Sequence, residues 1–288
     1  MTDTSTIVWV DGRRLPSDGV HVSARDRGFT LADGVFETMK ARNGKVFRLD
    51  RHLARLEASL RTLSIPVPSE LRDWVHAALN AAHLAETSVR LTVTRGVSAG
   101  GVVAAADVVP TVVVTIAPPP VFGTAIYDAG LTACVASGRR NEFSMTAGLK
   151  TLAYTDSVAA MIEAMKAGAD EVLFLDTAGH CSEASASNLF ALINGRLTTP
   201  PTSCAALPGI TRAAVIELAG DLGVAVDERP FDLRELLTST EAFLTSSLRG
   251  IAPLVSVEGQ TLGAGVPGPV TRQVMAAYAA LASQECGT

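Results

Sequence analysis

The run Ala117-Pro118-Pro119-Pro120 is the strongest break in this 288-residue chain and constrains its fold more than any other feature. Consecutive prolines cannot continue a helix or a central strand, and they are typical of an extended connection. We therefore expect two domains, residues 1–119 and 126–288, joined by a linker at 120–125. Strand and helix patterns mix in both halves without strict alternation. This favours an α+β fold over a doubly wound sheet or a TIM barrel.

Local patterns predict the elements of each half. Leu53, Leu56, Leu60 and Leu63 recur at helical spacing and predict a helix over 49–63, with Asp50 as its N-cap. The other predicted helices are 69–84, 151–167, 209–220 and 271–282. The predicted strands are 7–10, 34–41, 46–48, 89–94, 111–116, 125–135, 171–176, 189–193, 196–199, 224–229 and 240–246.

The composition excludes several classes of protein. The net charge is −5 and Lys and Arg form no long run, so we expect no nucleic-acid partner and no membrane partner. The longest apolar stretches, 102–106 and 108–117, are too short to span a bilayer. The polar N-terminus lacks a secretory signal and the four cysteines form no CxxC pair, so we expect a reduced, cytoplasmic protein. The histidine spacing matches no metal-binding motif, so we expect no metal.

Lysine is rare, since only four of the 24 basic residues are lysines. Lys150 alone among them lies in an apolar stretch, just before the helix predicted at 151–167. Apolar surroundings favour the uncharged, nucleophilic form of an amine, whereas arginine stays protonated. Lys150 is therefore the candidate for amine chemistry, against the plainer interpretation of a solvated surface charge.

Ser98 is a second candidate nucleophile, because Gly96-Val97-Ser98-Ala99-Gly100 matches the GxSxG pattern of serine hydrolases. That pattern belongs at a turn from a strand into a helix. Here the following residues are β-branched and end at Pro110, so a glycine-rich loop fits better. A serine hydrolase acting through Ser98 stays as an alternative.

Further features supply the groups that a phosphorylated aldehyde cofactor needs. Glu183 lies among small residues before a strand, where a carboxylate can face a protonated ring nitrogen. Ile210 and Thr211 open a helix whose free N–H groups and dipole suit a phosphate, and Ser246 and Ser247 add hydroxyl groups. An amine, a carboxylate and phosphate donors are the set that pyridoxal 5'-phosphate requires.

Six motifs stand in an order and spacing that belong together: Asp33-Gly34-Val35-Phe36-Glu37-Thr38, Arg51-His52-Leu53-Ala54-Arg55-Leu56, Leu149-Lys150-Thr151-Leu152, Glu183-Ala184-Ser185-Ala186-Ser187-Asn188, Gly209-Ile210-Thr211-Arg212 and Thr245-Ser246-Ser247-Leu248-Arg249-Gly250. Over nearly its whole length the sequence resembles the fold-type IV, or class IV, pyridoxal-phosphate-dependent aminotransferases. The resemblance implies a smaller N-terminal α/β domain and a larger C-terminal pseudo-barrel domain that binds the cofactor. It also implies a homodimer, in which a partner loop, about residues 96–103, closes over the active site.

The resemblance also implies residue roles. Lys150 would hold the cofactor as a Schiff base and shuttle the proton, and Glu183 would pair with the pyridine nitrogen. The other cofactor contacts implied are Arg55, Ile210, Thr211, Ser246 and Ser247 for the phosphate, Leu207 for the ring, Tyr154 for the cofactor hydroxyl, and Ser187 and Asn188.

The substrate side separates the members of the family. Phe36 and Glu37 would line it, and the nearest arginines for a substrate carboxylate are Arg25, Arg27 and Arg95. The tyrosine-glutamate-glycine run of branched-chain enzymes and the Arg-x-His carboxylate trap of D-amino-acid enzymes are both absent. An aromatic residue before Glu37 and loose carboxylate recognition favour amino transfer from D-amino acids or (R)-amines to 2-oxo acids. The alternatives are a branched-chain aminotransferase and aminodeoxychorismate lyase, which makes 4-aminobenzoate and pyruvate in the folate pathway.

Overall fold

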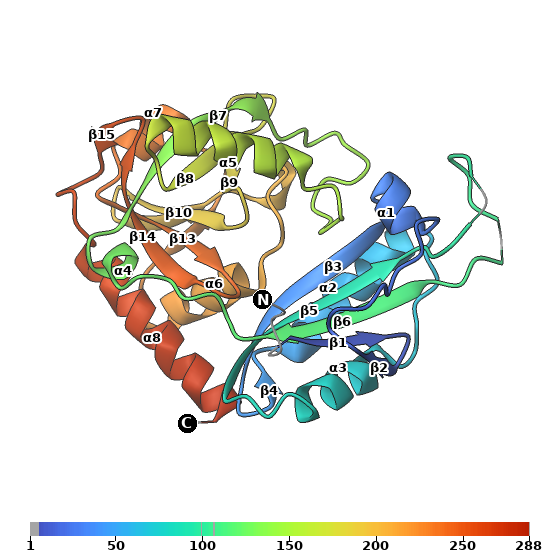
Figure 1. The fold of residues 1–288 in the computed structure, drawn as a ribbon. Coiled ribbons are helices and arrows are strands. Elements are labelled where there is room, and N and C mark those ends of the chain that lie inside the picture. The colour runs from blue at the N-terminus through green and yellow to red at the C-terminus, as the bar shows by residue number, and fades with distance from the viewer. Residues whose placement is uncertain (1–5, 99, 106, 288) are drawn as a thin grey trace. The chain divides into compact units, whose positions relative to one another are not determined.

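The computed structural model describes residues 6–98, 100–105 and 107–287, and the chain divides into two compact units (Figure 1). The first unit comprises Met1–Pro120, Leu149–Ala153 and Ala282–Thr288. The second comprises Val121–Gly148 and Tyr154–Leu281. The first unit therefore includes a short segment, containing Lys150, from beyond the proline run.

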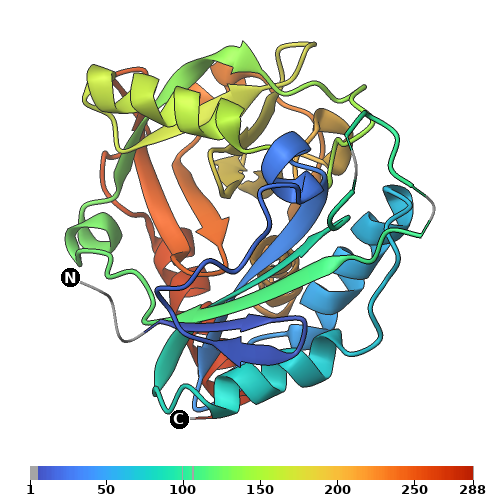
Figure 2. The ribbon, with the colours of Figure 1, turned by 45° about the vertical axis from the view of Figure 1, so that its right-hand side comes forward.

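The first unit is a six-stranded antiparallel sheet in the order β2-β1-β6-β5-β3-β4. Helices α2 and α3 pack on one face of it, as Figure 2 also shows. The elements are β1 (Ile7–Val10), β2 (Arg13–Leu15), α1 (Arg27–Leu31), β3 (Gly34–Arg42), β4 (Lys45–Val46), α2 (Leu49–Thr62), α3 (Leu71–Asn80), β5 (Glu86–Thr94) and β6 (Thr111–Ala117).

Alternation along β3 decides which side chains reach the helices. Val35, Met39 and Ala41 join the core beneath α2 and α3, and Glu37 points the same way. Phe36 points to the opposite face, because successive side chains of a strand alternate. Phe36 and Glu37, which are neighbours in one motif, therefore lie on opposite faces of the sheet.

The start of α2 differs from the prediction. The helix predicted at 49–63 is confirmed, but Asp50 is not its N-cap. Arg48 precedes the helix in a left-handed conformation with φ of 53°. Asp50 lies in the first turn and pairs with Arg72 at 2.7 Å. An acidic group in the first turn still complements the positive end of the helix dipole.

The helix predicted at 151–167 is present, but its predicted start is wrong. Helix α5 begins at Thr155, and residues 149–153 are extended beside β3. The N–H of Leu152 donates to the carbonyl of Gly34 at 3.0 Å. The backbone groups of this segment thus bond to a strand instead of to the next helical turn.

The second unit is a nine-stranded mixed sheet with helices around it. Its elements are α4 (Ala125–Asp128), β7 (Leu131–Arg139), α5 (Thr155–Ala167), β8 (Glu171–Leu175), β9 (Cys181–Ala184), β10 (Asn188–Ile193), β11 (Arg196–Thr199), the 3₁₀ turn η1 (Thr202–Cys204), α6 (Ile210–Asp221), β12 (Val226–Glu228), α7 (Leu233–Leu237), β13 (Glu241–Ser246), β14 (Gly250–Val257), β15 (Gln260–Thr261) and α8 (Pro269–Cys286). The last residues of α8 are grouped with the first unit.

Strand β9 pairs with both β8 and β10, so β10, β13, β14, β7, β8 and β9 form a closed ring. Phe190 of β10 and Phe243 of β13 stack at 5.0 Å and pack with Val215 of α6 and Val274 of α8. A separate core contains Leu131, Leu173, Leu189 and Leu244, which come from four strands of the ring. This barrel-like sheet, with the two-unit mixed composition, confirms the expected α+β fold class.

The strand predicted at 125–135 is only partly correct. Residues Ala125–Asp128 form the short helix α4, and the strand β7 begins at Leu131. Gly130 separates them with φ of 90°, and a Cβ there would lie 2.4 Å from Val255. Periodicity alone does not reveal this glycine turn.

Candidate active site

Lys150 lies on the segment Leu149–Ala153, which bonds to the edge of β3 in the first unit. Its carbonyl accepts the N–H of Phe36 at 3.0 Å, which fixes the lysine backbone to the strand. Its Nζ lies 4.6 Å from the centre of the Phe36 ring, on the face of the sheet opposite to α2 and α3. The amine is thus held over an aromatic ring.

Arg90 of β5 shares that ring with Lys150. It lies opposite Thr38 of β3, one diagonal step from Phe36, and its guanidinium carbon is 3.8 Å from the ring centre. Each cation is attracted to the ring face. Two cations, an amine and a guanidinium, therefore contact the same aromatic ring. Arg90 was missed from the sequence, although a lone charge between Val89 and Leu91 in a β-branched strand is a usable signal.

Glu37 points to the helix side of the sheet, where it binds two residues of α2. Its Oε2 accepts from His52 Nδ1 at 2.7 Å and from Arg55 Nη2 at 2.6 Å, and its Oε1 accepts from Arg55 Nε at 2.8 Å. Burial alone would raise the pKa of Glu37, but the hydrogen bonds and charges of its two partners hold that pKa below its ordinary value. Burial lowers the pKa of His52, so a neutral imidazole donates to the carboxylate. We infer that Glu37 orients Arg55.

Glu183 lies where β9 and β10 close the ring of the second unit, directly across from Asn188. Its Oε2 accepts the N–H of Leu207 at 2.9 Å, and Asn188 Nδ2 donates to the Leu207 carbonyl at 2.8 Å. The structure therefore brings together three of the predicted cofactor residues.

Arg140 supports this group and was also missed from the sequence. Its Nε lies 3.4 Å from Glu183 Oε1, its Nη2 donates to Ser157 Oγ at 3.0 Å, and its guanidinium carbon is 4.1 Å from the Phe174 ring centre. The guanidinium thus supplies a positive charge beside the Glu183 carboxylate. Two adjacent arginines after a predicted strand gave no pattern that pointed to this role.

Helix α6 begins directly after Gly209, and its N-terminus is buried. Ile210 and Thr211 are 8% and 3% exposed, and no side chain of the described residues caps the helix at Gly209. A Cβ at Gly209 would lie 1.9 Å from Asn188 Oδ1, so the close approach requires glycine. Buried N–H groups without a side-chain cap are the donors that a phosphate would satisfy.

The remaining predicted cofactor residues also lie in the second unit. Ser246 ends β13 and pairs with Gly250, so Ser247 lies in the turn between β13 and β14. Ser187 is buried just before β10, and Tyr154 directly precedes α5. Their roles toward a cofactor stay predictions.

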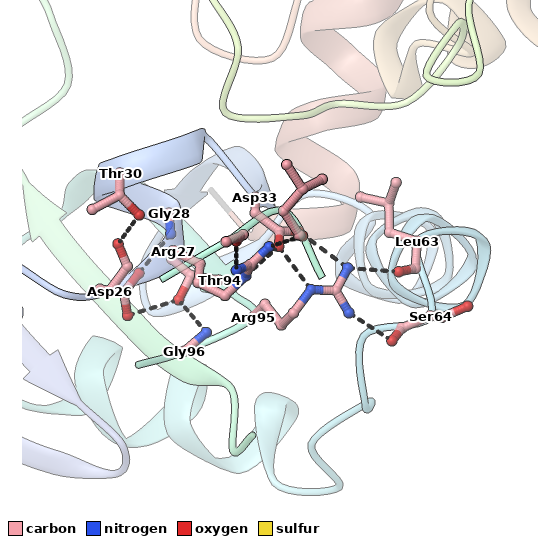
Figure 3. Close-up of polar contacts among 12 residues, drawn as sticks. Asp26, Arg27, Gly28, Thr30, Asp33, Leu63, Ser64, Thr94, Arg95 and Gly96 are labelled. Carbon is pink, nitrogen blue, oxygen red and sulfur yellow. Dashed lines mark hydrogen bonds and ion pairs between the residues drawn. The ribbon is translucent and has the colours of Figure 1, made fainter. Parts of the chain in front are cut away.

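Arg95, predicted for a substrate carboxylate, is an anchor within the first unit (Figure 3). Its Nε and Nη2 bind Asp33 at 2.7 and 3.1 Å, and it donates to two backbone carbonyls just after α2. Arg27 shares Asp33 and donates to two carbonyls of the loop before β6. Burial would raise the pKa of Asp33, but hydrogen bonds from Arg95 and Arg27 lower it. A cavity of about 390 Å³ adjoins these three residues.

The loop that contains Ser98 does not form a nucleophile elbow. Among the described residues between β5 and β6 no helix follows the strand, which the elbow requires. Ala99, within the GxSxG match, lies outside the described residues. Across the ranges that the structure describes, no helix is long and apolar enough to cross a membrane.

Comparison with known proteins identifies the family. The family model for amino-transferase class IV matches residues 34–257, and the chain belongs to this family. It is 35% identical over 272 residues to a putative branched-chain-amino-acid aminotransferase of Methanocaldococcus jannaschii, covering 93% of each chain. It is 29% identical over 273 residues to the D-alanine aminotransferase of Bacillus licheniformis, covering 94% of this chain and 95% of that one.

Solved structures agree with this assignment. The Escherichia coli branched-chain amino acid aminotransferase superposes with a TM-score of 0.91 at 28% identity, over 97% of this chain and 95% of that chain. The 4-amino-4-deoxychorismate lyase of Pseudomonas aeruginosa superposes with a TM-score of 0.85 at 33% identity, over 94% and 97%. Class IV aminotransferases depend on pyridoxal phosphate, and this chain is a transaminase of that class.

Proposed function

We propose that the chain transfers the amino group of an α-amino acid to a 2-oxo acid, and that Arg90 binds the α-carboxylate. The observation that carries this proposal is that Arg90 and Lys150 both contact the Phe36 ring, the Arg90 guanidinium carbon at 3.8 Å and Lys150 Nζ at 4.6 Å from its centre. In an α-amino acid the carboxylate is attached to the carbon that bears the amine. Arg90 is a cation on the same face of the sheet as Lys150, and a guanidinium binds a carboxylate through paired hydrogen bonds, so we infer that it holds the substrate carboxylate while Lys150 acts on the amine-bearing carbon.

The chain's own residues fit the cofactor. Bound pyridoxal phosphate supplies an aldehyde for the amine and a ring that withdraws electrons from the substrate α-carbon. Lys150 would hold the aldehyde carbon and then carry the proton from the α-carbon. Glu183 would keep the ring nitrogen protonated. The phosphate would be held by the buried N-terminus of α6 and by Thr211, Ser247 and Arg55, because these groups offer N–H and O–H donors.

Arg90 changes the expected donor. Loose carboxylate recognition was expected because no Arg-x-His trap is visible in the sequence, and this favoured D-amino acids or (R)-amines. Arg90, which contacts the same ring as Lys150, would supply the missing carboxylate contact. Together with the likeness to branched-chain aminotransferases over nearly the whole chain, it supports L-amino acids with branched apolar side chains as donors.

Two other candidates retain specific support. D-amino acid transfer is supported by the likeness to a D-alanine aminotransferase and by the aromatic residue before Glu37. Aminodeoxychorismate lysis is supported by the 33% identity to a lyase of that activity. Both reactions use the same amine and the same ring chemistry, and they differ in the fate of the substrate.

A set of half-reactions tests the proposal. L-leucine, D-alanine and (R)-1-phenylethylamine are added separately to the holoenzyme, and loss of the cofactor's visible absorbance band is followed. We expect rapid loss with L-leucine. Fast conversion by D-alanine alone or by (R)-1-phenylethylamine would move the assignment to amino transfer from D-amino acids or (R)-amines. Pyruvate release from aminodeoxychorismate without any half-reaction would move it to the lyase. Lys150→Ala should abolish the band and every half-reaction.

The Arg90 variant tests the carboxylate contact separately. Arg90→Leu should raise KM for L-leucine about 10- to 100-fold, since a hydrogen-bonded charge pair is worth about 1.5–3 kcal/mol. The rate with (R)-1-phenylethylamine, which has no carboxylate, should change little. Arg13→Leu, on an exposed strand, is the matched control. Equal losses with both donors would contradict a carboxylate-binding role.

We also propose a homodimer. Val102 and Val103 in the first unit are 85% and 87% exposed, and Phe143 and Met145 in the second are 82% and 95% exposed. Contiguous exposed apolar surface marks interaction sites in proteins, so each of these two pairs is a candidate contact surface. Light scattering on the purified protein should give twice the chain mass of 29.9 kDa, and a monomer at assay concentration would contradict this.

A further inference from the structure

Three metal-ligating side chains of the second unit meet outside the residues proposed to bind the cofactor. They are Asp176, His180 and Cys204, and one potential ligand atom from each lies within 4.8 Å of the others. Asp176 Oδ2 is 3.2 Å from His180 Nδ1. Cys204 Sγ lies within 4.8 Å of the ligand atoms of both other residues.

The fold builds this cluster from a turn and a 3₁₀ segment. Asp176 follows β8 and His180 precedes β9, and the turn between them closes with the His180 N–H donating to Asp176 Oδ1 at 2.8 Å. One carboxylate oxygen therefore secures the turn, while the other faces the imidazole. Cys204 ends η1, more than twenty residues later in the sequence, so no local motif predicts the cluster.

The cluster is buried except on the side of His180. The Asp176 side chain is 3% exposed and Cys204 is 2% exposed, whereas the His180 side chain is 40% exposed. Glu142, at the surface, accepts two hydrogen bonds from Thr177 of the same turn and adds negative charge near His180. A buried carboxylate beside a half-exposed imidazole is therefore accessible to a cation from solvent, and buried charges in proteins are generally paired or bound to metals.

We propose that Asp176, His180 and Cys204 bind one divalent transition-metal ion of the zinc type. Sulfur, imidazole nitrogen and carboxylate oxygen form the mixed donor set that zinc accepts in tetrahedral sites. The 3.2 Å between Asp176 Oδ2 and His180 Nδ1 is close to the edge of about 3.3 Å expected for a tetrahedron with bonds of about 2.0 Å. On binding, Cys204 sulfur forms the third bond and its proton leaves to solvent, while water completes the fourth position on the exposed side.

The ion would join two segments that carry predicted cofactor residues. The turn at 176–180 leads directly into β9, which holds Glu183. Cys204 precedes Leu207, whose N–H binds the Glu183 carboxylate, and precedes helix α6. A metal at this cluster would restrain both segments within the second unit. This inference does not depend on the donor proposed above.

Metal binding by the holoenzyme tests the proposal. Chelator-treated protein is titrated with ZnCl2 against a chromophoric zinc indicator, and Co2+ is used in parallel for its difference spectrum. We expect one saturable site per chain and a thiolate-to-cobalt charge-transfer band. Cys204→Ser and His180→Gln should each weaken zinc binding at least about tenfold, because each removes one ligand. Unchanged circular dichroism would show that each variant remains folded.

Matched controls separate this site from other thiols and imidazoles. Cys134→Ser in β7 and His76→Gln on the exposed side of α3 should leave both the zinc affinity and the cobalt band unchanged. The proposal is overturned if no saturable binding occurs, if Cys204→Ser keeps the cobalt band, or if His180→Gln binds zinc as the unchanged protein does. In those cases the three residues form a hydrogen-bonded group only.

Discussion

Glu37→Gln removes one buried negative charge while preserving the shape of the side chain. The Glu37 side chain is 1% exposed and its carboxylate accepts all three hydrogen bonds from His52 and Arg55. A glutamine in its best orientation keeps the bonds at one oxygen but places an NH2 group against Arg55 Nε–H. Arg55, with 10% side-chain exposure, then loses the buried counter-charge that Glu37 supplies.

We estimate the cost at about 3 kcal/mol, because breaking a buried ion pair by removing one partner typically costs about 3–5 kcal/mol and two hydrogen bonds survive here. With an m-value of about 2–3 kcal/mol/M in urea, the midpoint should fall by about 1–1.5 M. Tryptophan fluorescence is the appropriate assay, since the chain has two tryptophans, Trp9 and Trp74, and both pack against the core of the first unit.

The matched control is Glu86→Gln on the neighbouring strand β5. Glu86 also binds two cations, Arg42 at 2.6 Å and Lys40 at 3.3 Å, but its side chain is 38% exposed. An exposed pair contributes about 0–1 kcal/mol, so this variant should unfold near the midpoint of the unchanged protein. If Glu37→Gln lost no more than Glu86→Gln, burial would not be the source of the stabilisation.

The effect of Glu37→Gln also has a definite pH dependence. The folded-state pKa of Glu37 lies below its ordinary value of 4.5, so its stabilisation is present above pH 4.5 and disappears as the pH falls through the folded value. The pKa of His52 is lowered too, so its protonation below pH 6.5 favours unfolding. Because Glu37 raises the pKa of His52, its removal should first widen the difference between the two proteins below pH 6.5, and the difference should narrow only as the pH falls through the folded-state pKa of Glu37, below 4.5. A difference that kept growing as Glu37 became protonated would contradict the assignment.

Two further variants address the second unit. Glu183→Gln should still bind pyridoxal phosphate but lose at least about 100-fold in turnover, because a neutral amide does not stabilise a protonated ring nitrogen; stopped-flow half-reactions measure this, and full activity would exclude the role. Gly209→Ala should weaken phosphate binding, because its Cβ would meet Asn188 Oδ1 at 1.9 Å and disturb the bond from Asn188 to the Leu207 carbonyl; cofactor titration measures this, with Gly220→Ala, where a Cβ meets nothing within 4 Å, as the control.

The sequence was sufficient to predict most elements, because β-branched runs and leucine spacing carry local periodicity. The helix α2 and the strand β6 are correct to within a residue or two. The start of the helix expected at 151–167 was predicted wrongly, because the backbone there bonds to Gly34 and Phe36, more than a hundred residues away. Such bonds depend on which strand is left unpaired, and this is not visible in local propensity.

The residues of the candidate site also differ in whether local sequence or long-range pairing reveals them. Lys150, Glu183 and Asn188 stand in motifs, so the sequence could propose them as candidates, and their roles stay predictions. Arg90 became apparent only when the pairing of β5 with β3 placed it over Phe36. Glu37 could not be assigned to the helix side without the register of β3, because a shift of one residue exchanges the two faces of a strand.

The segment Leu149–Ala153 has a consequence for the order in which the chain is made. It completes an edge of the first sheet at Gly34–Phe36, yet it follows almost thirty residues of the second unit. During synthesis the backbone groups of Gly34 and Phe36 at this edge of β3 therefore stay unpaired until residue 153 has left the ribosome. Unpaired edges invite association with other chains. A fragment ending at Pro120 should for this reason aggregate more than a chain that also includes the segment Leu149–Ala153.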